Sequence, residues 1–397
     1  MTEKAELVRA GPEGVDEALE LIRRLAVHVG PRRPCSHEEK RAAQLLERWL
    51  DERRVAAECE HFDGYASFGY PYALIVGAAL AGGLLQRRGR RLGDVLAAAS
   101  LAVAALEGDL RVTPLSDLLS RRPSVNVVGA VDAARESRQT VCLCAHLDTT
   151  RSGLIFHPRV VRQLALLLQL PAACGALLSA GPLLRRLPGA KHLQMAGIAG
   201  MAASLALLLE REVRGHDVPG ANDNASGAAV AAQLAAECAA SPLEHTGVRL
   251  LITSCEESGL LGAQAYARGH SEEAARTTFL NFDSVGGEAP LTYILREGSA
   301  SATRPASPRL VELTQAIAHR RPELGLVPSR ATPGLPTDAT VFRARGWEAI
   351  TLLAQSEAGI PNYHWPTDTY DNVSTGAVAR ALETGRELLT ELDRAAA

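Results

Sequence analysis

The chain has 397 residues, of which 47% are apolar, so it is long enough for two or three average domains and can bury a sizeable core. Its formal net charge is −3, from 42 basic and 45 acidic residues, which gives no electrostatic case for nucleic acid as a partner. The seven cysteines are scattered, odd in number and without a CxxC pair, which argues against a disulfide framework and favours a reducing compartment.

The chain opens with charged residues over 1–15 and no apolar run, so no cleavable secretory signal is expected there. Apolar positions at helical spacing predict two helices, over 15–29 and 36–54. Beyond them, β-branched and leucine-rich runs alternate with helical stretches, which is typical of an α/β sheet covered by helices. The strands are predicted over 124–131, 140–145, 248–254, 277–282 and 348–353, and the later helices over 224–240, 307–320 and 374–394.

Four uncharged stretches interrupt this alternation and form two pairs, each joined by a short basic loop. Their lengths are 23, 12, 22 and 17 residues, over 64–86, 95–106, 163–184 and 193–209. A helix that crosses a bilayer needs about 20 apolar residues. The first and third stretches therefore qualify, the fourth is marginal and the second is short. We expect two apolar helical hairpins, which either enter a membrane or form a lid or a dimer surface.

The side of the membrane stays open. The positive-inside rule would leave the hairpin loops cytoplasmic and the rest of the chain outside, whereas the free cysteines and the charged opening favour the reverse. The expected location is the cytoplasmic membrane, with a soluble cytoplasmic protein as the alternative. The basic loop residues are Arg87, Arg88, Arg90, Arg91, Arg185, Arg186 and Lys191.

Histidines and acidic residues stand where several of the predicted strands end. Ligands of α/β sheets bind beyond the carboxyl ends of the strands, so these side chains are expected to meet. Two further candidates lie in a glycine- and asparagine-rich turn and in a loop before the last helix. In chain order the candidate residues are His146, Asp148, Asp223, Glu256, Glu257, Asp283 and His364.

Imidazole nitrogens and carboxylate oxygens of this kind are zinc ligands. Two zinc ions about 3.5–4 Å apart need a bridging carboxylate, and Asp223 suits that place because its turn bends sharply. The side chains of Glu256 and Glu257 point in different directions, so one can bind metal while the other serves as general base. Asp148 would orient the ring of His146. Each motif is weak alone, since such a turn is usually a helix cap and such a pair is usually solvated.

In combination, these motifs resemble metallopeptidase family twenty-eight, the co-catalytic zinc aminopeptidases, whose relatives include glutamate carboxypeptidase II. A looser similarity covers 22–43 and 337–353, so about 290 residues take part. The matching stretches are AHLD (145–148), GANDNASG (220–227), EESGLLG (256–262), FDSVG (282–286) and YHWPTDT (363–369).

The resemblance implies a zinc aminopeptidase-like fold, an α/β architecture with a mixed, mostly parallel sheet flanked by helices. The peptidase domain would consist of 1–61, 119–153 and 211–397. The two apolar hairpins would be inserts at 62–118 and 154–210.

The resemblance also implies a ligand set for two Zn²⁺ ions. One ion would be held by His146 and Asp283 and the other by Glu257 and His364, with Asp223 bridging both. The implied activity is that of an exopeptidase, and the preferred hypothesis is an aminopeptidase. A hydroxide that bridges the two zinc ions would attack the peptide carbonyl.

The remaining site residues follow from the same resemblance. Glu256 would take a proton from the attacking water and pass it to the leaving amine, and Asp148 is the second carboxylate assigned to the catalytic group. Asp368 would be an outer-shell or substrate-side carboxylate. The bond between Asp223 and Asn224 is a candidate for a cis peptide.

The chain departs from the family between His146 and Asp223, which stand 77 positions apart where the family has a much shorter loop. The second apolar pair fills this interval, so its helices must leave and re-enter the fold near the metal site. Three alternatives stay open: a non-catalytic member that binds or organises membranes, a single-zinc glutaminyl cyclase, and a carboxypeptidase. The expected partners are a peptide or aminoacyl substrate, a membrane and, as an option, a second copy of the chain.

Overall fold

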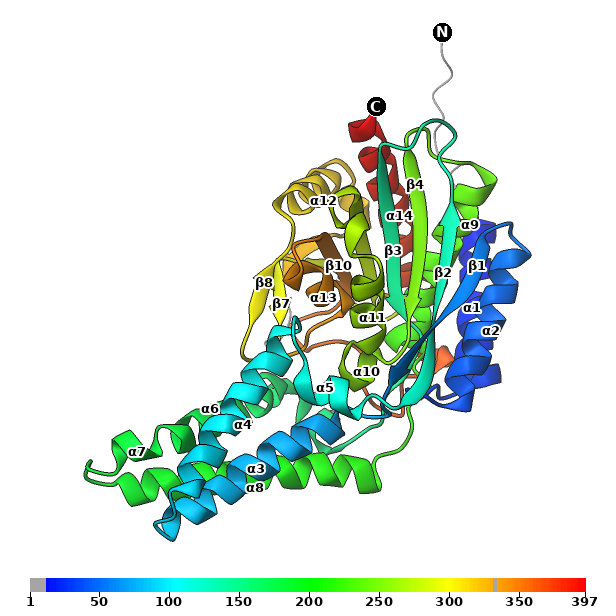
Figure 1. The fold of residues 1–397 in the computed structure, drawn as a ribbon. Helices are drawn as coiled ribbons and strands as arrows, with labels where there is room; N and C mark the ends of the chain where they lie inside the picture. The colour runs from blue at the N-terminus through cyan, green and yellow to red at the C-terminus, as the bar shows by residue number, and fades with distance from the viewer. Residues whose placement is uncertain (1–11, 331–333) are drawn as a thin grey trace.

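The centre of the protein is an eight-stranded mixed sheet with the order β1-β2-β4-β3-β5-β10-β6-β9, in a computed structural model that describes residues 12–330 and 334–397 (Figure 1). The pairs β3–β4, β3–β5, β5–β10 and β6–β9 are parallel, and the other neighbouring pairs are antiparallel. The predicted fold class is therefore confirmed. The strands are β1 (Ala56–Gly64), β2 (Arg122–Val131), β3 (Gln139–His146), β4 (Thr246–Thr253), β5 (Thr277–Asp283), β6 (Leu291–Ile294), β9 (Val327–Ser329) and β10 (Glu348–Ala354), with β7 (Arg296–Gly298) and β8 (Thr303–Pro305) forming a separate ribbon.

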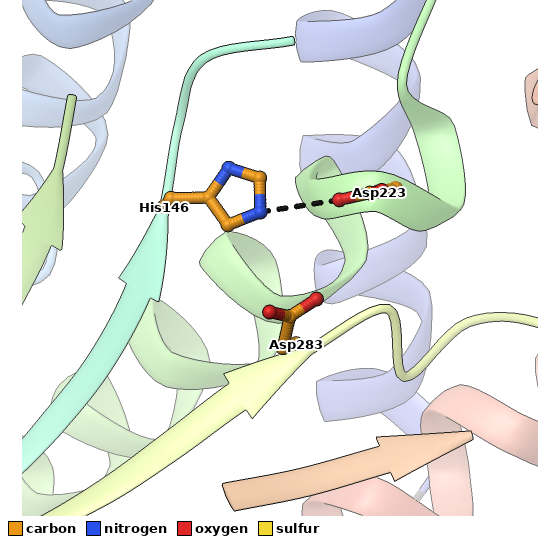
Figure 2. A group of neighbouring side chains, drawn as sticks. All are labelled: His146, Asp223 and Asp283. Carbon is orange, nitrogen blue, oxygen red and sulfur yellow. Dashed lines mark ion pairs between the residues drawn. The ribbon is translucent and has the colours of Figure 1, made fainter. Parts of the chain in front are cut away.

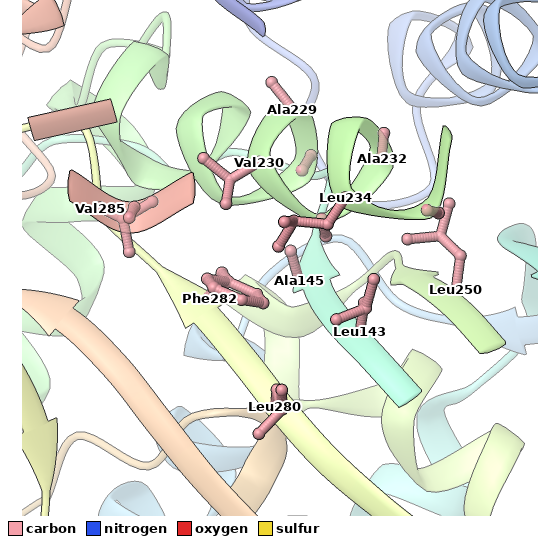
Figure 3. Close-up of a cluster of buried hydrophobic side chains, with 14 of the residues drawn as sticks. Leu143, Ala145, Ala229, Val230, Ala232, Leu234, Leu250, Leu280, Phe282 and Val285 are labelled. Carbon is pink, nitrogen blue, oxygen red and sulfur yellow. The ribbon is translucent and has the colours of Figure 1, made fainter. Parts of the chain in front are cut away.

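Helices cover both faces of this sheet and bury a separate core on each. On one face Leu143 and Phe282 pack with Leu234 in the larger cluster (Figure 3), whereas Cys144 and Phe279 point into the other core. Strands buried on both sides read as continuous apolar runs, which is why the sequence identified the central ones. The covering helices are α1 (Pro12–Arg23), α2 (His37–Asp51), α9 (Gly227–Ala240), α12 (Pro308–Arg320) and α14 (Thr375–Ala396) on the first face, and α11 (Leu261–Gly269) and α13 (Asp338–Ala344) on the second.

The apolar stretches form an inserted helical arm that projects from one end of the sheet (Figure 1). Its helices pack through small residues: a Cβ added at Gly200 would lie 2.2 Å from Cys174 Sγ, and one at Gly82 would lie 2.9 Å from the backbone nitrogen of Ala97. Such close approach gives the arm its own small core. We define the arm as α3 (Gly69–Arg87), α4 (Leu92–Asp109), α6 (Leu164–Ser179) and α8 (Ala190–Arg214), with the short helices α5 (Pro114–Leu119) and α7 (Gly181–Leu184) beside them.

The outer surface of the arm is unusually apolar. All but two of the exposed large apolar side chains in the described residues lie on the arm or on the segments next to it, the exceptions being Val27 and Val327. Three helices of the described chain are long and apolar enough to cross a membrane: Gly69–Arg87, Val161–Ser179 and Ala190–Arg214. The last of these helices contains the stretch 193–209, whose 17 uncharged residues are marginal for a membrane-spanning helix. The charged opening from which no signal peptide is expected lies largely outside the described residues.

Candidate metal centre

Two parallel strands and one turn bring the first group of candidate ligands together. His146 ends β3 and Asp283 ends β5, so both lie at the same edge of the sheet, while Asp223 comes from the turn Ala221–Ser226 before α9 (Figure 2). His146 Nε2 lies 3.1 Å from Asp223 Oδ1. The three side chains offer ligand atoms within 4.8 Å of one another, and all three are buried.

A second group shares Asp223 with the first. His364 Nε2 lies 3.2 Å from Asp223 Oδ2 and 3.0 Å from Glu257 Oε1. Asp223, Glu257 and His364 again offer ligand atoms within 4.8 Å of one another. The structure thus brings together all five predicted ligands, and the two oxygens of Asp223 face different histidines.

The donor set fits a divalent cation such as zinc. Three carboxylates, those of Asp223, Glu257 and Asp283, are buried together, which is costly without positive charge among them. His364 Nδ1 is buried and has no hydrogen-bond partner in the described chain. Nitrogen and oxygen donors in this mixture are those that zinc prefers.

The pKa shifts of the candidate ligands also favour a bound cation. Burial raises the pKa of Asp283 to about 7. Burial lowers the pKa of His364, but the carboxylates of Glu257 and Asp223 outweigh it and raise the value to about 9. For Asp223, burial is outweighed by the hydrogen bonds from the two histidines, which lower its pKa. The cluster is therefore strongly attractive to positive charge.

Asp368 fixes the turn that carries the central carboxylate. Its Oδ1 accepts a hydrogen bond from the Asn222 N–H at 2.6 Å and its Oδ2 accepts one from the Asp223 N–H at 3.0 Å. The peptide bond between Asp223 and Asn224 is cis, as the resemblance implies. Asn224 Nδ2 donates to the Phe282 carbonyl at 2.9 Å, which ties the turn to the end of β5.

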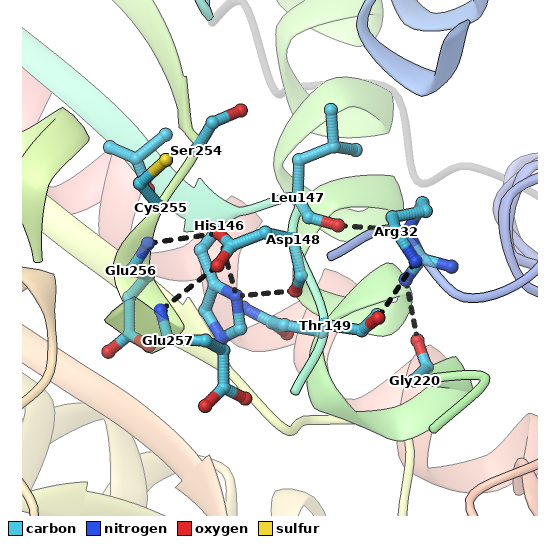
Figure 4. A network of polar contacts seen from close by, with 12 residues as sticks. Arg32, His146, Leu147, Asp148, Thr149, Gly220, Ser254, Cys255, Glu256 and Glu257 are labelled. Atoms are coloured by element: carbon cyan, nitrogen blue, oxygen red, sulfur yellow. Dashed lines mark hydrogen bonds and ion pairs between the residues drawn. The ribbon is translucent and has the colours of Figure 1, made fainter. Parts of the chain in front are cut away.

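Asp148 acts on the glutamate pair through the backbone. Its two carboxylate oxygens each accept one hydrogen bond at 3.0 Å, from the N–H groups of Glu256 and Glu257 (Figure 4). His146 Nδ1 lies 3.1 Å from the Asp148 carbonyl oxygen and 3.8 Å from its carboxylate. Asp148 is fully buried and does not line the cavities around the ligands. This geometry is that of a positioning residue, which agrees with the orienting role expected for Asp148, and its assignment to the catalytic group stays a prediction.

Arg32 is a site residue that the sequence analysis did not identify. Its buried guanidinium donates to the carbonyl oxygens of Leu147 and Gly220, each at 2.8 Å (Figure 4). It also donates to the Pro219 carbonyl at 2.9 Å and to two carbonyls of its own segment. It joins the loop after β3 to the loop before Asp223. Arg32 belongs to the segment Pro-Arg-Arg-Pro at 31–34, and no sequence pattern in that segment indicates this role.

Asp338 was likewise missed. It begins α13, is 1% exposed, and its Oδ2 accepts a hydrogen bond from the Thr253 hydroxyl at the end of β4. Its other oxygen has no hydrogen-bond partner in the described chain, and burial raises its pKa to about 6. The segment 337–353 already resembled the family, and a carboxylate at its start was the available indication.

Glu256 occupies the position expected of a base. It lines the cavity of about 40 Å³ that contains the five ligands and also borders a larger cavity beside it. Burial, reinforced by the charge of Glu257, raises its pKa well above the ordinary value against the opposing effect of His146. A carboxyl group with a raised pKa can both take and return a proton near neutral pH.

The second insert touches the metal centre directly. The segments on either side of this insert are joined by backbone pairing of Arg151 with Asp217. The ring of Phe156, just inside the insert, lies 4.4 Å from the ring of His364, and Tyr363 stacks on the same histidine at 3.8 Å. The insert therefore re-enters the fold beside the site and covers one side of it.

Comparison with known proteins agrees with this geometry. Residues 202–389 match the model of peptidase family M28, a segment that contains Asp223, Glu256, Glu257, Asp283 and His364. The probable lipoprotein aminopeptidase LpqL of Mycobacterium tuberculosis is 26% identical over 190 residues, which is 40% of this chain and 37% of that protein. The match thus spans well under half of the relative's length.

Solved structures show the same fold at low sequence identity. A zinc aminopeptidase of Bacillus subtilis superimposes with a TM-score of 0.58 at 15% identity, covering 95% of each chain. A Zn-dependent exopeptidase of Parabacteroides distasonis gives 0.58 at 14% identity, covering 95% of this chain and 97% of the other. A glutaminyl cyclase of Bacteroides thetaiotaomicron gives 0.57 at 15%, with coverage of 95% and 97%. The resemblance to peptidase family M28 is therefore confirmed by the family match over residues 202–389 and by the shared fold.

Proposed function

We propose that the protein is a zinc-dependent exopeptidase with two metal ions, and specifically an aminopeptidase. The observation that supports two ions is the sharing of Asp223 between two ligand groups, each with its own histidine and its own second carboxylate. The names of the relatives support zinc as the metal and aminopeptidase action as the activity. The cluster of buried carboxylates would also attract the free amine of a substrate.

Each candidate residue would have its own role in hydrolysis. His146 and Asp283 would hold one ion, Glu257 and His364 the other, and Asp223 both. Bound zinc supplies a Lewis acid that polarises the peptide carbonyl and makes water a better nucleophile. Glu256 takes the proton of the attacking water and delivers it to the leaving nitrogen, so that the C–N bond breaks and a free carboxylate and amine result. Asp148 holds Glu256 in place through its backbone.

The test combines zinc content with turnover. We expect close to two zinc ions per chain and release of amino acids from aminoacyl chromogenic substrates, both abolished by a chelator. Glu256→Gln should retain the zinc while kcat falls about 10²- to 10⁴-fold, since only the proton carrier is lost. Glu52→Gln, at an exposed residue directly after α2, is the matched control and should leave kcat unchanged. Wild-type turnover in Glu256→Gln would show that the base assignment is wrong.

A glutaminyl cyclase is the second candidate, because a cyclase superimposes as well as the peptidases do. The two hypotheses differ in metal content, since two zinc ions are expected for the peptidase and a single one for a glutaminyl cyclase. One zinc per chain, with release of ammonia from an N-terminal glutamine peptide, would favour cyclisation over peptide hydrolysis. Release of the C-terminal amino acid from a peptide with a blocked amino terminus would instead indicate a carboxypeptidase.

We also propose that the arm attaches the protein to a membrane. Support comes from three helices of sufficient length and apolarity, and from the apolar side chains that they expose. The full chain expressed in cells should stay in the membrane fraction after washing with high salt or alkaline carbonate. Release of a monodisperse dimer into the soluble fraction would instead assign the apolar surface to a contact between two copies.

A further inference from the structure

The larger cavity extends from the metal centre into the helical arm. Its volume is about 260 Å³. At one end it is lined by Glu256, Glu257 and His364, and at the other by Val76 of α3 and Ser204 of α8. The peptidase residues and the inserted helices thus share one continuous space.

The walls of this cavity are suited to an apolar occupant. Between its two ends they consist mostly of aromatic and aliphatic side chains such as Phe68, Phe156 and Leu207. Cavities lined in this way bind ligands mainly by removing apolar surface from water. Polar residues also line the cavity away from the candidate ligands, namely Glu107, Thr113, Ser116, Ser204, Arg211, Gln264 and Ser299.

The two buried charged groups in the arm wall are already satisfied by the protein. Glu107 accepts hydrogen bonds from the backbone of Leu115 and from the Ser116 hydroxyl, at 2.6 and 2.7 Å. Arg211 donates to the Ser67 hydroxyl at 3.2 Å and to the Glu212 carboxylate at 3.0 Å. Neither group therefore calls for a charged or polar ligand in this part of the cavity.

The cavity is also deep. Ser204 and Arg211 both line it and stand seven residues apart on α8, which corresponds to about 10 Å along the helix axis. A leucyl side chain anchored at the metal centre would fill only the near part. An unbranched chain of several more carbons is needed to reach Ser204.

We propose that this cavity binds a long unbranched apolar chain carried by the acyl group that is cleaved, so that the preferred substrates are lipophilic amides or peptides. The proposal rests on the proposed hydrolytic function and specifies its substrate class. Hydrolysis adds water across the amide: the oxygen joins the acyl carbon, the C–N bond breaks, and the leaving amine takes a proton. The chain could be the side chain of an α-amino acid or a fatty acyl group without an amine.

A chain-length series tests the proposal on the full, zinc-loaded protein. The substrates are alanyl, norleucyl, α-aminooctanoyl and α-aminodecanoyl anilides, with octanoyl and decanoyl anilides as the series without the amine. We expect kcat/KM to rise up to about fourfold for each added methylene, the value for its full burial. A rise confined to the amino series identifies an amino acid side chain as the occupant, and a rise in both identifies a fatty acyl chain.

A variant at the far end links this preference to the cavity. Ser204→Phe places a ring where the end of the chain would lie, and should reduce the ratio of α-aminodecanoyl to alanyl kcat/KM by about tenfold or more. Leu209→Phe lies on the same helix but on its outer side, where Leu209 is 50% exposed, and should leave the ratio unchanged. Zinc content and thermal unfolding check that both variants are folded.

The outcomes separate this proposal from the function on which it rests. If the alanyl substrate is hydrolysed but kcat/KM falls with chain length, the cavity does not hold the chain and the proposal is overturned. If no anilide is hydrolysed, the hydrolytic function fails, and binding of decylamine against butylamine by calorimetry decides on the cavity. Tighter binding of decylamine that Ser204→Phe removes would support it, and equal binding would overturn it.

Discussion

At the scale of single residues, Asp148 gives a sharp test of positioning through the backbone. Asp148→Asn keeps one oxygen acceptor but turns an amide NH₂ toward one of the N–H groups that the carboxylate now accepts. We expect kcat to fall about 10- to 100-fold, with KM nearly unchanged, because the base and a ligand are displaced rather than removed. Steady-state kinetics with zinc saturating measures this, and a loss confined to KM would contradict it.

Proton release on zinc binding follows from the charges of the ligand group. Without metal, the neighbouring carboxylates raise the pKa of His364 to about 9, so the ring is protonated near pH 7. Zinc binds only the neutral imidazole, so binding must expel that proton, and the release should shrink as pH rises past about 9. Calorimetric titration in buffers of different ionisation enthalpy would detect it. A binding enthalpy that does not depend on the buffer near pH 7 would contradict the raised pKa.

The buried side chain of Arg32 joins two loops of the fold. Arg32→Met leaves buried carbonyls without donors, and we expect the free energy of unfolding to fall by about 3–5 kcal/mol. Its neighbour Arg33 makes only a half-exposed ion pair at 3.5 Å with Asp217, so Arg33→Met should cost less than about 1 kcal/mol. Urea denaturation of both variants gives the comparison, and equal values would show that the carbonyl contacts of Arg32 contribute little.

At the scale of elements, two glycines of the arm should respond in opposite directions. A Cβ at Gly200 would meet Cys174 Sγ, so Gly200→Ala should destabilise the protein by about 1–3 kcal/mol. A Cβ at Gly77 on α3 would meet nothing within 4 Å, so Gly77→Ala should stabilise it by about 0.5–1 kcal/mol through the higher helix propensity of alanine. Thermal unfolding of the two variants measures the signs. The same sign in both would show that the arm is not closely packed at Gly200.

The elements also show where sequence reasoning succeeds. The central strands were found because both faces are buried and their residues form short apolar runs. The strands β1, β6 and β9 of the main sheet were missed, because β1 is half exposed and carries glutamates and a histidine, and β6 and β9 have only four and three residues. The five candidate ligands, which the structure brings together, could be predicted because each belongs to a local motif. Arg32 and Asp338 were missed because their roles arise only when distant segments meet.

At the scale of the whole molecule, the candidate site residues could be predicted from sequence motifs, whereas the position of the arm beside them could be seen only in the structure. The ligand motifs resemble a family and therefore name a metal and a reaction. The arm does not belong to that resemblance, so only the three-dimensional structure shows that it shares a cavity with the metal centre. Under the proposed function, the insert would select the substrates and the residues at the edge of the sheet would supply the chemistry.

Both inserts close on themselves where they leave the sheet. The first is pinned where the Arg121 N–H donates to the Gly64 carbonyl at 3.0 Å, and the second where Arg151 pairs with Asp217. Each is in effect an enlarged hairpin loop whose ends meet, so its length can change without shifting the register of the strands beneath it. Evolution or a protein engineer could therefore exchange the arm as a cassette, and obtain a different substrate range from an unaltered set of catalytic residues.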